Sequence, residues 1–168
     1  MTASSKIRRA PSVHPASEPL ILGWQEWVAL PDLGLPAIKA KIDTGAKTSA
    51  LHAFTVEPYG RAGTPKVRFG IHPAPRRSDI EVFCSAPVLD QRRVTSSNGE
   101  SELRYIIATT LQIGDRSWPI EIGLANRDGM SARMLLGRQA IPAGVLIDPR
   151  ASFHQPRLGF KLYRRKPA

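Results

Sequence analysis

Cysteine is nearly absent from this chain: Cys84 is the single thiol among 168 residues. One cysteine cannot build an internal disulfide framework, and its isolation favours a reducing compartment. The sequence also lacks an apolar run long enough to cross a membrane, and Lys6, Arg8 and Arg9 near its start have no apolar signal-peptide region behind them. We therefore expect a cytoplasmic protein with no membrane contact.

Two kinds of site signature are missing as well. No Gly-x-x-x-x-Gly-Lys-Ser/Thr phosphate loop is present, so the chain itself is not expected to bind ATP. The side chains that zinc would need are His52, His72, His154 and Cys84, and none stands at the short spacings of zinc sites. We predict no cofactor and no metal, and a zinc-dependent peptidase stays open as an alternative.

The most informative residues present are Asp43-Thr44-Gly45, which directly follow a strand-like alternation. This pattern is typical of an aspartic-protease half-site. Amide hydrolysis by carboxylates needs two of them sharing one proton, because like charges a few ångströms apart cannot both ionise. Asp43 is the predicted carboxylate, Thr44 offers a hydroxyl to an opposing loop, and Gly45 lets backbone N–H groups approach closely.

The sequence encodes only half of such a dyad. A second Asp-Ser/Thr-Gly is absent from it, so a two-fold homodimer that brings two copies of Asp43 together is the simplest route to a complete site. The tripeptide alone is a weak signal, because most such tripeptides are ordinary loops. A second motif, Leu135-Leu136-Gly137-Arg138, strengthens the interpretation.

Together the two motifs resemble those of retropepsin-like proteases, in which an apolar-apolar-glycine run braces the catalytic loop. Over residues 20–150 the chain also resembles the RimK-associated family, whose members are called ATP-dependent zinc proteases and accompany ATP-grasp ligases that add glutamates. The resemblance implies a peptidase with such a ligase as partner, braced by Leu135, Leu136, Gly137 and Arg138. The matching stretches are 23–31, 39–52, 67–73, 84–88, 93–97, 104–107, 126–130, 133–138 and 148–149.

Strand-like alternation dominates the remaining sequence. Apolar and polar residues alternate through 38–43, 67–72 and 80–84, and the segments 103–113 and 118–124 predict a hairpin that turns at Gly114-Asp115. Helix signals are scarce, and the best is a short turn that begins at Arg138 and is stopped by Pro142. We therefore predict an all-β fold: a small closed β-barrel of the retropepsin-like acid-protease type, with one short helix after Leu-Leu-Gly.

The formal net charge of +10 is concentrated at the two ends of the sequence. Residues 1–19 hold three bases and one acid, and residues 150–168 hold six bases and no acid, which leaves the middle nearly neutral. We predict a flexible basic arm over 1–19, a peptidase domain over 20–150 and a basic tail over 151–168. Basic tails attract polyanions loosely, so a ribosome contact through them is a further hypothesis.

A polar segment, 94–102, turns at Asn98-Gly99 and is the candidate for a lid over the dyad, with an exposed hairpin of no role as the alternative. Guanidinium groups bind carboxylates in a bidentate manner, so cations near the motifs suit an acidic peptide substrate. The rival interpretation is a non-catalytic module that holds acidic peptides or ribosomal components. The predicted substrate-binding residues are Lys47, Arg93, Ser97 and Arg104.

Overall fold

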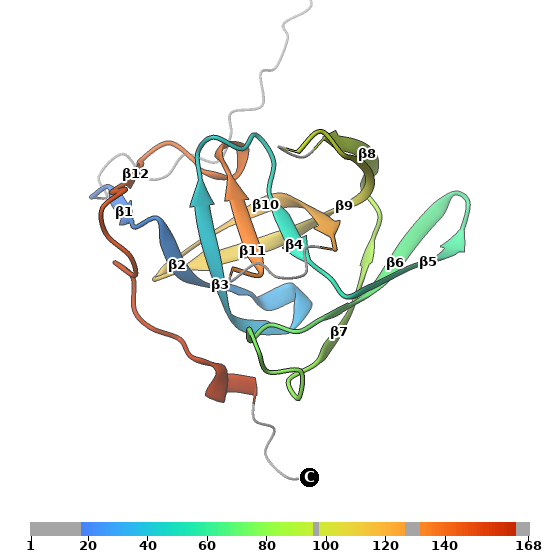
Figure 1. Ribbon diagram of the computed structural model, residues 1–168, viewed down its shortest axis with the longest axis horizontal. Coiled ribbons are helices and arrows are strands. Elements are labelled where there is room, and N and C mark those ends of the chain that lie inside the picture. Colours follow the sequence, from blue (N-terminus) through green and yellow to red (C-terminus); the bar gives the residue numbers. More distant parts are fainter. Residues whose placement is uncertain (1–17, 96–97, 127–131, 164–168) are drawn as a thin grey trace, which may run out of the picture.

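Strands make up most of the regular structure in the computed structural model, which describes residues 18–95, 98–126 and 132–163 (Figure 1). Among these residues no helix is long and apolar enough to cross a membrane. The 3-10 helices are η1 (Pro31–Leu33), η2 (Arg138–Ala140) and η3 (Phe160–Tyr163). The strands are β1 (Leu20–Leu22), β2 (Gln25–Leu30), β3 (Leu35–Asp43), β4 (Ala50–His52), β5 (Thr55–Arg61), β6 (Thr64–Ile71), β7 (Val82–Pro87), β8 (Asp90–Thr95), β9 (Ser101–Ile113), β10 (Arg116–Ala125), β11 (Met134–Gly137) and β12 (Val145–Ile147).

Six of these strands close into a barrel within the described part of the chain. Their order is β10-β4-β11-β3-β2-β9, the pairing of β9 with β10 closes the ring, and β8 extends the sheet beyond β9. β4 runs parallel to β10, and β3 runs parallel to β11. A closed ring satisfies the backbone hydrogen bonds that an open sheet edge would leave exposed. The prediction of an all-β fold with a closed barrel is confirmed.

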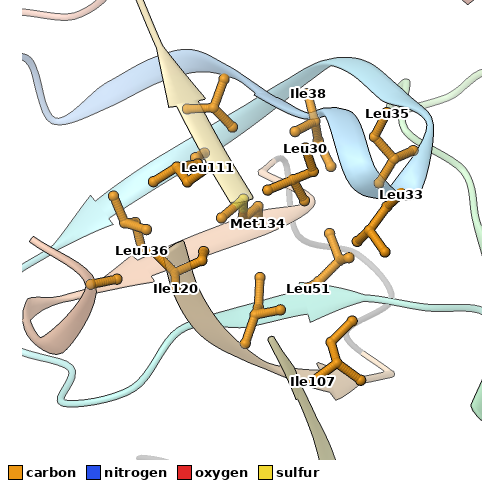
Figure 2. Packing of buried hydrophobic residues seen from close by; sticks show 14 of the residues in the cluster. Leu30, Leu33, Leu35, Ile38, Leu51, Ile107, Leu111, Ile120, Met134 and Leu136 are labelled. Atoms are coloured by element: carbon orange, nitrogen blue, oxygen red, sulfur yellow. The ribbon is translucent and has the colours of Figure 1, made fainter. Parts of the chain in front are cut away.

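Alternating side chains fill the barrel interior. On β3, Ile38, Ala40 and Ile42 are buried, whereas Lys39 and Lys41 point away from the interior and are more exposed. Burying one such aliphatic side chain contributes about 1.5–3 kcal/mol before entropy costs. Figure 2 shows buried side chains from several strands meeting in this interior, among them Leu30, Leu51, Leu111 and Met134.

Two local predictions are confirmed. β9 and β10 form the predicted antiparallel hairpin, with Ile113 opposite Arg116 next to the turn. Gly114 takes a positive φ of 60° there, which glycine adopts without steric cost. The short helix expected after Leu-Leu-Gly is the 3-10 turn η2, which ends just before Ile141.

A separate three-stranded sheet, in the order β5-β6-β7, projects from the barrel (Figure 1). It contains the alternating segment 67–72, in which Val67, Phe69 and Ile71 are buried. The strand expected over 80–84 begins later, at Val82, because residues 77–80 form a turn closed by a hydrogen bond. The sequence pattern indicated these strands but did not indicate that they leave the barrel.

Residues 151–163, which the composition assigned to the basic tail, pack against the barrel. The Ala151 carbonyl accepts a 2.8 Å hydrogen bond from the Trp24 N–H, and the Phe153 N–H donates to the Gln25 carbonyl at 2.9 Å. These contacts join the C-terminal segment to the start of β2. The segment therefore belongs structurally with the domain that it follows.

One buried carboxylate secures this junction. Glu26 on β2 is fully buried, and its side chain accepts backbone N–H bonds from Gly23 (2.7 Å), His154 (2.9 Å) and Gln155 (3.0 Å). A carboxylate loses much solvation free energy on burial, and multiple charge-assisted hydrogen bonds are what offset that cost. Glu26 thus fastens the C-terminal segment to β2.

Replacing Glu26 by alanine is expected to lower the free energy of unfolding by about 3–5 kcal/mol, because buried backbone donors lose their acceptor. Glu26→Gln keeps the size and one acceptor oxygen, so the loss should be smaller. Urea unfolding followed by tryptophan fluorescence measures both values. Glu57→Ala on the exposed β5 is the control, and an equal loss in the Glu57 and Glu26 variants would contradict this role.

Cys84 is a buried residue of β7, and its Sγ donates to the Leu33 carbonyl at 3.2 Å. Burial raises the pKa of this thiol to about 11, because the thiolate would lose its hydration. The thiol therefore stays protonated at neutral pH. Its position joins the β5-β6-β7 sheet to η1 beside the barrel.

Cys84 should react with iodoacetamide at pH 8 on the order of a hundredfold more slowly in the native protein than in the unfolded chain. The thiolate is the reactive form, and an ordinary cysteine thiol, with a pKa near 8.5, forms it far more readily than the buried thiol does. Mass spectrometry of the alkylated chain over time, with and without urea, measures the two rates. Equal rates in both conditions would show that the thiol is not held in the protected state described here.

Candidate active site

Asp43 lies at the end of β3, where the alternation that buries Ile42 leaves the aspartate partly exposed. A loop over residues 44–49 follows and returns the chain to the barrel in β4. Thr44 and Gly45 are exposed in this loop. The three residues predicted to be catalytic thus lie together at one end of a barrel strand, with the aspartate partly exposed to solvent.

The backbone of the loop holds the Asp43 carboxylate. Its Oδ1 accepts N–H bonds from Gly45 at 3.1 Å and from Ala46 at 3.2 Å. A Cβ atom on residue 45 would stand 3.2 Å from that oxygen, so any side chain there would press on the carboxylate. These two charge-assisted hydrogen bonds fix the orientation of the carboxylate. Because both donors are backbone groups, no donor side chain has to lose conformational freedom.

β11 supports the loop from the neighbouring position in the barrel. It runs parallel to β3 and places Gly137 beside Asp43. The Arg138 N–H donates to the Ala46 carbonyl at 2.8 Å, and the Arg138 guanidinium donates to the Gly45 carbonyl at 3.3 Å. The support is rigid because the whole strand is buried in the barrel, including Met134, Leu135 and Leu136.

Gly137 allows this close approach. Its N–H donates to Ser49 Oγ at 3.0 Å. A Cβ atom at this position would lie 2.4 Å from the Thr48 carbonyl oxygen and 2.6 Å from the carbonyl carbon. Because these obstacles are backbone atoms of the loop that carries Asp43, a side chain at position 137 would displace that loop.

The predicted substrate-binding cations occupy different elements around the loop. Lys47 is exposed in the loop itself, and Arg93 is exposed on β8. The Arg104 side chain on β9 is only 11% exposed, and its Nε lies 3.4 Å from a Glu102 carboxylate oxygen. Lys47 and Arg93 therefore present their charge to solvent, whereas Arg104 has an acidic neighbour. Ser97 falls outside the described residues.

The segment considered as a lid, 94–102, lies at the turn end of the β8–β9 hairpin, and residues 96–97 within it fall outside the described residues. The two strands pair in antiparallel register, from Asp90 opposite Ile106 to Thr95 opposite Ser101. Gly99 has a positive φ of 85°, consistent with the turn expected at this point. The hairpin is present as predicted, and its closure over a substrate stays a prediction.

A cavity of about 490 Å³ lies beside the loop that follows Asp43. Its lining comes from the end of the loop, from β9 and β10, from η2, and from Arg92 on β8. Arg92 binds Asp90 at 2.9 Å and Glu121 at 3.1 Å, and these carboxylates raise the pKa of its guanidinium. Sequence reasoning missed this cavity, because its residues are far apart along the chain and none belongs to a recognisable motif.

The candidate zinc ligands have separate structural neighbours. His72 stacks on Phe54 with ring centroids 4.1 Å apart, and His154 lies 3.5 Å from an Asp148 oxygen. His52 is buried in β4. Over 18–95, 98–126 and 132–163, no three His, Cys, Asp or Glu side chains gather closely enough to hold a metal ion.

Comparison with known proteins identifies the family. Residues 21–158 match the model of the RimB-like family, described as the retropepsin-like aspartic endopeptidase RimB. The chain belongs to the RimB-like family. The resemblance noted from its two motifs is confirmed. In this RimB-like chain, Asp43 accepts hydrogen bonds from the loop that follows it, and β11 of the barrel lies beside it.

Relatives of this RimB-like chain include longer proteins named probable alpha-L-glutamate ligase. One from Shewanella pealeana is 49% identical over 79% of this chain, and one from Parasynechococcus marenigrum is 48% identical over 81% of it. The match covers 29% of each relative, so the chain spans less than a third of their length. A crystal structure of a Legionella pneumophila protein of unknown function matches with a TM-score of 0.66 and 26% identity, covering 80% of this chain and 97% of that one.

Gly137→Ala in this RimB-like chain should lower the free energy of unfolding by about 1–3 kcal/mol, because the new Cβ collides with the backbone of Thr48. Thermal unfolding measures the loss. Gly63→Ala is the matched control, since a Cβ there has nothing within 4 Å. Equal shifts in melting temperature for the two variants would contradict the close packing at Gly137.

Proposed function

We propose that this chain is one half of a homodimeric aspartic endopeptidase, to which each subunit contributes the carboxylate of Asp43. One observation carries the proposal: two backbone N–H groups orient this carboxylate, in a loop that β11 holds in place. Gly45 lets the backbone approach the carboxylate, and the buried strand β11 lies beside Asp43 and keeps this arrangement in place. The described chain contributes one such aspartate, so a second subunit completes the site.

Two such carboxylates at a two-fold axis share a single proton, because they cannot both ionise at close range. The ionised carboxylate takes a proton from a water molecule, and the water oxygen attacks the carbonyl carbon of the peptide bond. The protonated carboxylate gives its proton to the carbonyl oxygen. When the tetrahedral intermediate collapses, the C–N bond breaks and the amine leaves with a proton from the dyad.

Acidic peptides are the proposed substrates. Lys47 and Arg93 expose positive charge on the catalytic loop and on β8, and cations of this kind bind carboxylates. The names of the longer relatives support the same class, since a peptidase that works with a glutamate ligase would remove residues that the ligase adds. An ATP-grasp ligase is therefore the proposed partner, and the cytoplasm is the proposed compartment.

A ribosome contact through the basic ends stays a prediction. Residues 1–17 and 164–168, which hold the Lys6-Arg8-Arg9 cluster and Arg164-Arg165-Lys166, lie outside the described residues. The non-catalytic interpretation, in which the cations only hold acidic peptides, is separated from the peptidase by the experiment that follows.

Asp43→Asn should lower kcat/KM for a glutamate-tailed peptide by at least about a thousandfold, because the dyad loses the carboxylate that activates water. Mass spectrometry of the cleavage products measures the rate. Asp115→Asn, at an exposed position in the β9–β10 turn, is the matched control and should retain wild-type activity.

Three results would contradict the proposal in different ways. Undiminished cleavage by Asp43→Asn would remove Asp43 from the mechanism. Cleavage that is lost on adding a chelator and restored by zinc would indicate a metallopeptidase. Tight peptide binding by both proteins, with no cleavage of any peptide, would favour the non-catalytic module.

A further inference from the structure

The cavity beside the catalytic loop is placed to contact a bound peptide. Thr48 and Ser49, at the end of the loop, form one side of it. Ser49 also accepts the Gly137 hydrogen bond, and Gly137 lies beside Asp43 in the sheet. One lining residue, Ser49, is thus connected to Asp43 through Gly137 alone. This connection makes the cavity the candidate site for a side chain of an extended substrate bound across Asp43.

The cavity lining is mixed, and apolar groups supply somewhat more of its surface than polar groups do. Ile106 and Ala108 on β9 and Pro119 on β10 contribute to it, and Leu89 and Ala140 add further apolar surface. Its volume of about 490 Å³ falls within the range of cavities that bind small ligands, about 300–1,000 Å³. An aliphatic side chain entering such a site gains the free energy of leaving water.

The charged residues in the lining disfavour an acidic side chain. The Arg92 guanidinium is already bound to the carboxylates of Asp90 and Glu121. Arg92 and Glu121 both line the cavity and Asp90 lies outside the lining, so the guanidinium has no charge left without a carboxylate partner. A glutamate from the substrate would have to displace one of these carboxylates and would be repelled by the other.

The exposed cations lie on other elements. Lys47 belongs to the catalytic loop, and Arg93 is exposed on β8, whereas Arg92 next to it is partly buried and contributes to the cavity lining. Neighbouring residues of a strand point to opposite faces of the sheet. Arg93 therefore points to the face of β8 opposite the cavity, and Lys47 lies in the loop next to Thr48 at the edge of the cavity.

We propose that the cavity is a specificity subsite for an uncharged aliphatic side chain, so that the enzyme cuts where an acidic tail joins ordinary sequence and not within the tail. This inference rests on the proposed peptidase function and adds the class of peptide bond that the site selects. It assigns Ala108, Ile106 and Pro119 to the subsite floor, and Glu121 to the exclusion of acidic side chains.

The test compares an all-glutamate peptide with peptides that carry one leucine, moved stepwise through the same glutamate sequence. Wild-type enzyme should cut with a kcat/KM at least about tenfold higher when the leucine stands at one fixed distance from the cut bond, as expected for filling an apolar pocket. Ala108→Phe fills the cavity and should remove this preference. Ser117→Phe adds the same ring at an exposed position of the same hairpin outside the cavity lining, and should retain it.

A second variant should raise a cleavage rate, and a misfolded protein would not show such an increase. Glu121→Gln removes one carboxylate from around Arg92, so it should raise cleavage of the all-glutamate peptide while leaving cleavage of the leucine peptide nearly unchanged. Equal rates on both peptides in all variants would overturn the subsite and leave the peptidase function standing. No cleavage of any peptide by the wild-type enzyme would overturn both.

Discussion

The parallel pairing that sets Gly137 beside Asp43 is the contact on which the site depends. A loop that carries a catalytic carboxylate needs its own backbone donors directed at that carboxylate, and a free loop would not keep them there. Here β11 and the η2 turn that follows it hold the loop, because Arg138 and Gln139 of η2 donate hydrogen bonds to the loop carbonyls. A glycine is required at the junction because the Thr48 backbone occupies the place of a side chain.

The strand that ends in Asp43 is also held from its other side. The Ile42 N–H donates to the Trp24 carbonyl at 2.8 Å, and the Trp24 N–H donates to the Ala151 carbonyl. The buried Glu26 then fastens this C-terminal segment to β2. The position of Asp43 is thus coupled through hydrogen bonds to residues at both ends of the domain, and the barrel acts as a frame for it.

Local features of the fold could be predicted from the sequence, and features made by distant contacts could not. Alternation and a glycine turn predicted the β9–β10 hairpin, and Pro142 predicted where η2 ends. Burial of Glu26 could not be predicted, because glutamate in a strand is usually exposed, and its partners include His154 at the far end of the chain. The projecting β5-β6-β7 sheet has the same periodicity as barrel strands, so periodicity does not tell them apart. For the candidate site, Asp43, its loop and Gly137 carried motifs, whereas the cavity is assembled from ordinary strand residues.

The most direct test of a site shared between two subunits is the activity of mixed dimers. Wild-type chain is mixed with increasing amounts of Asp43→Asn chain at a constant total concentration, after unfolding and refolding together so that subunits exchange. If each site needs Asp43 from both subunits, activity falls as the square of the wild-type fraction, to about one quarter in an equal mixture. A linear decrease to about one half would show that one chain carries a complete site, and would contradict the shared dyad.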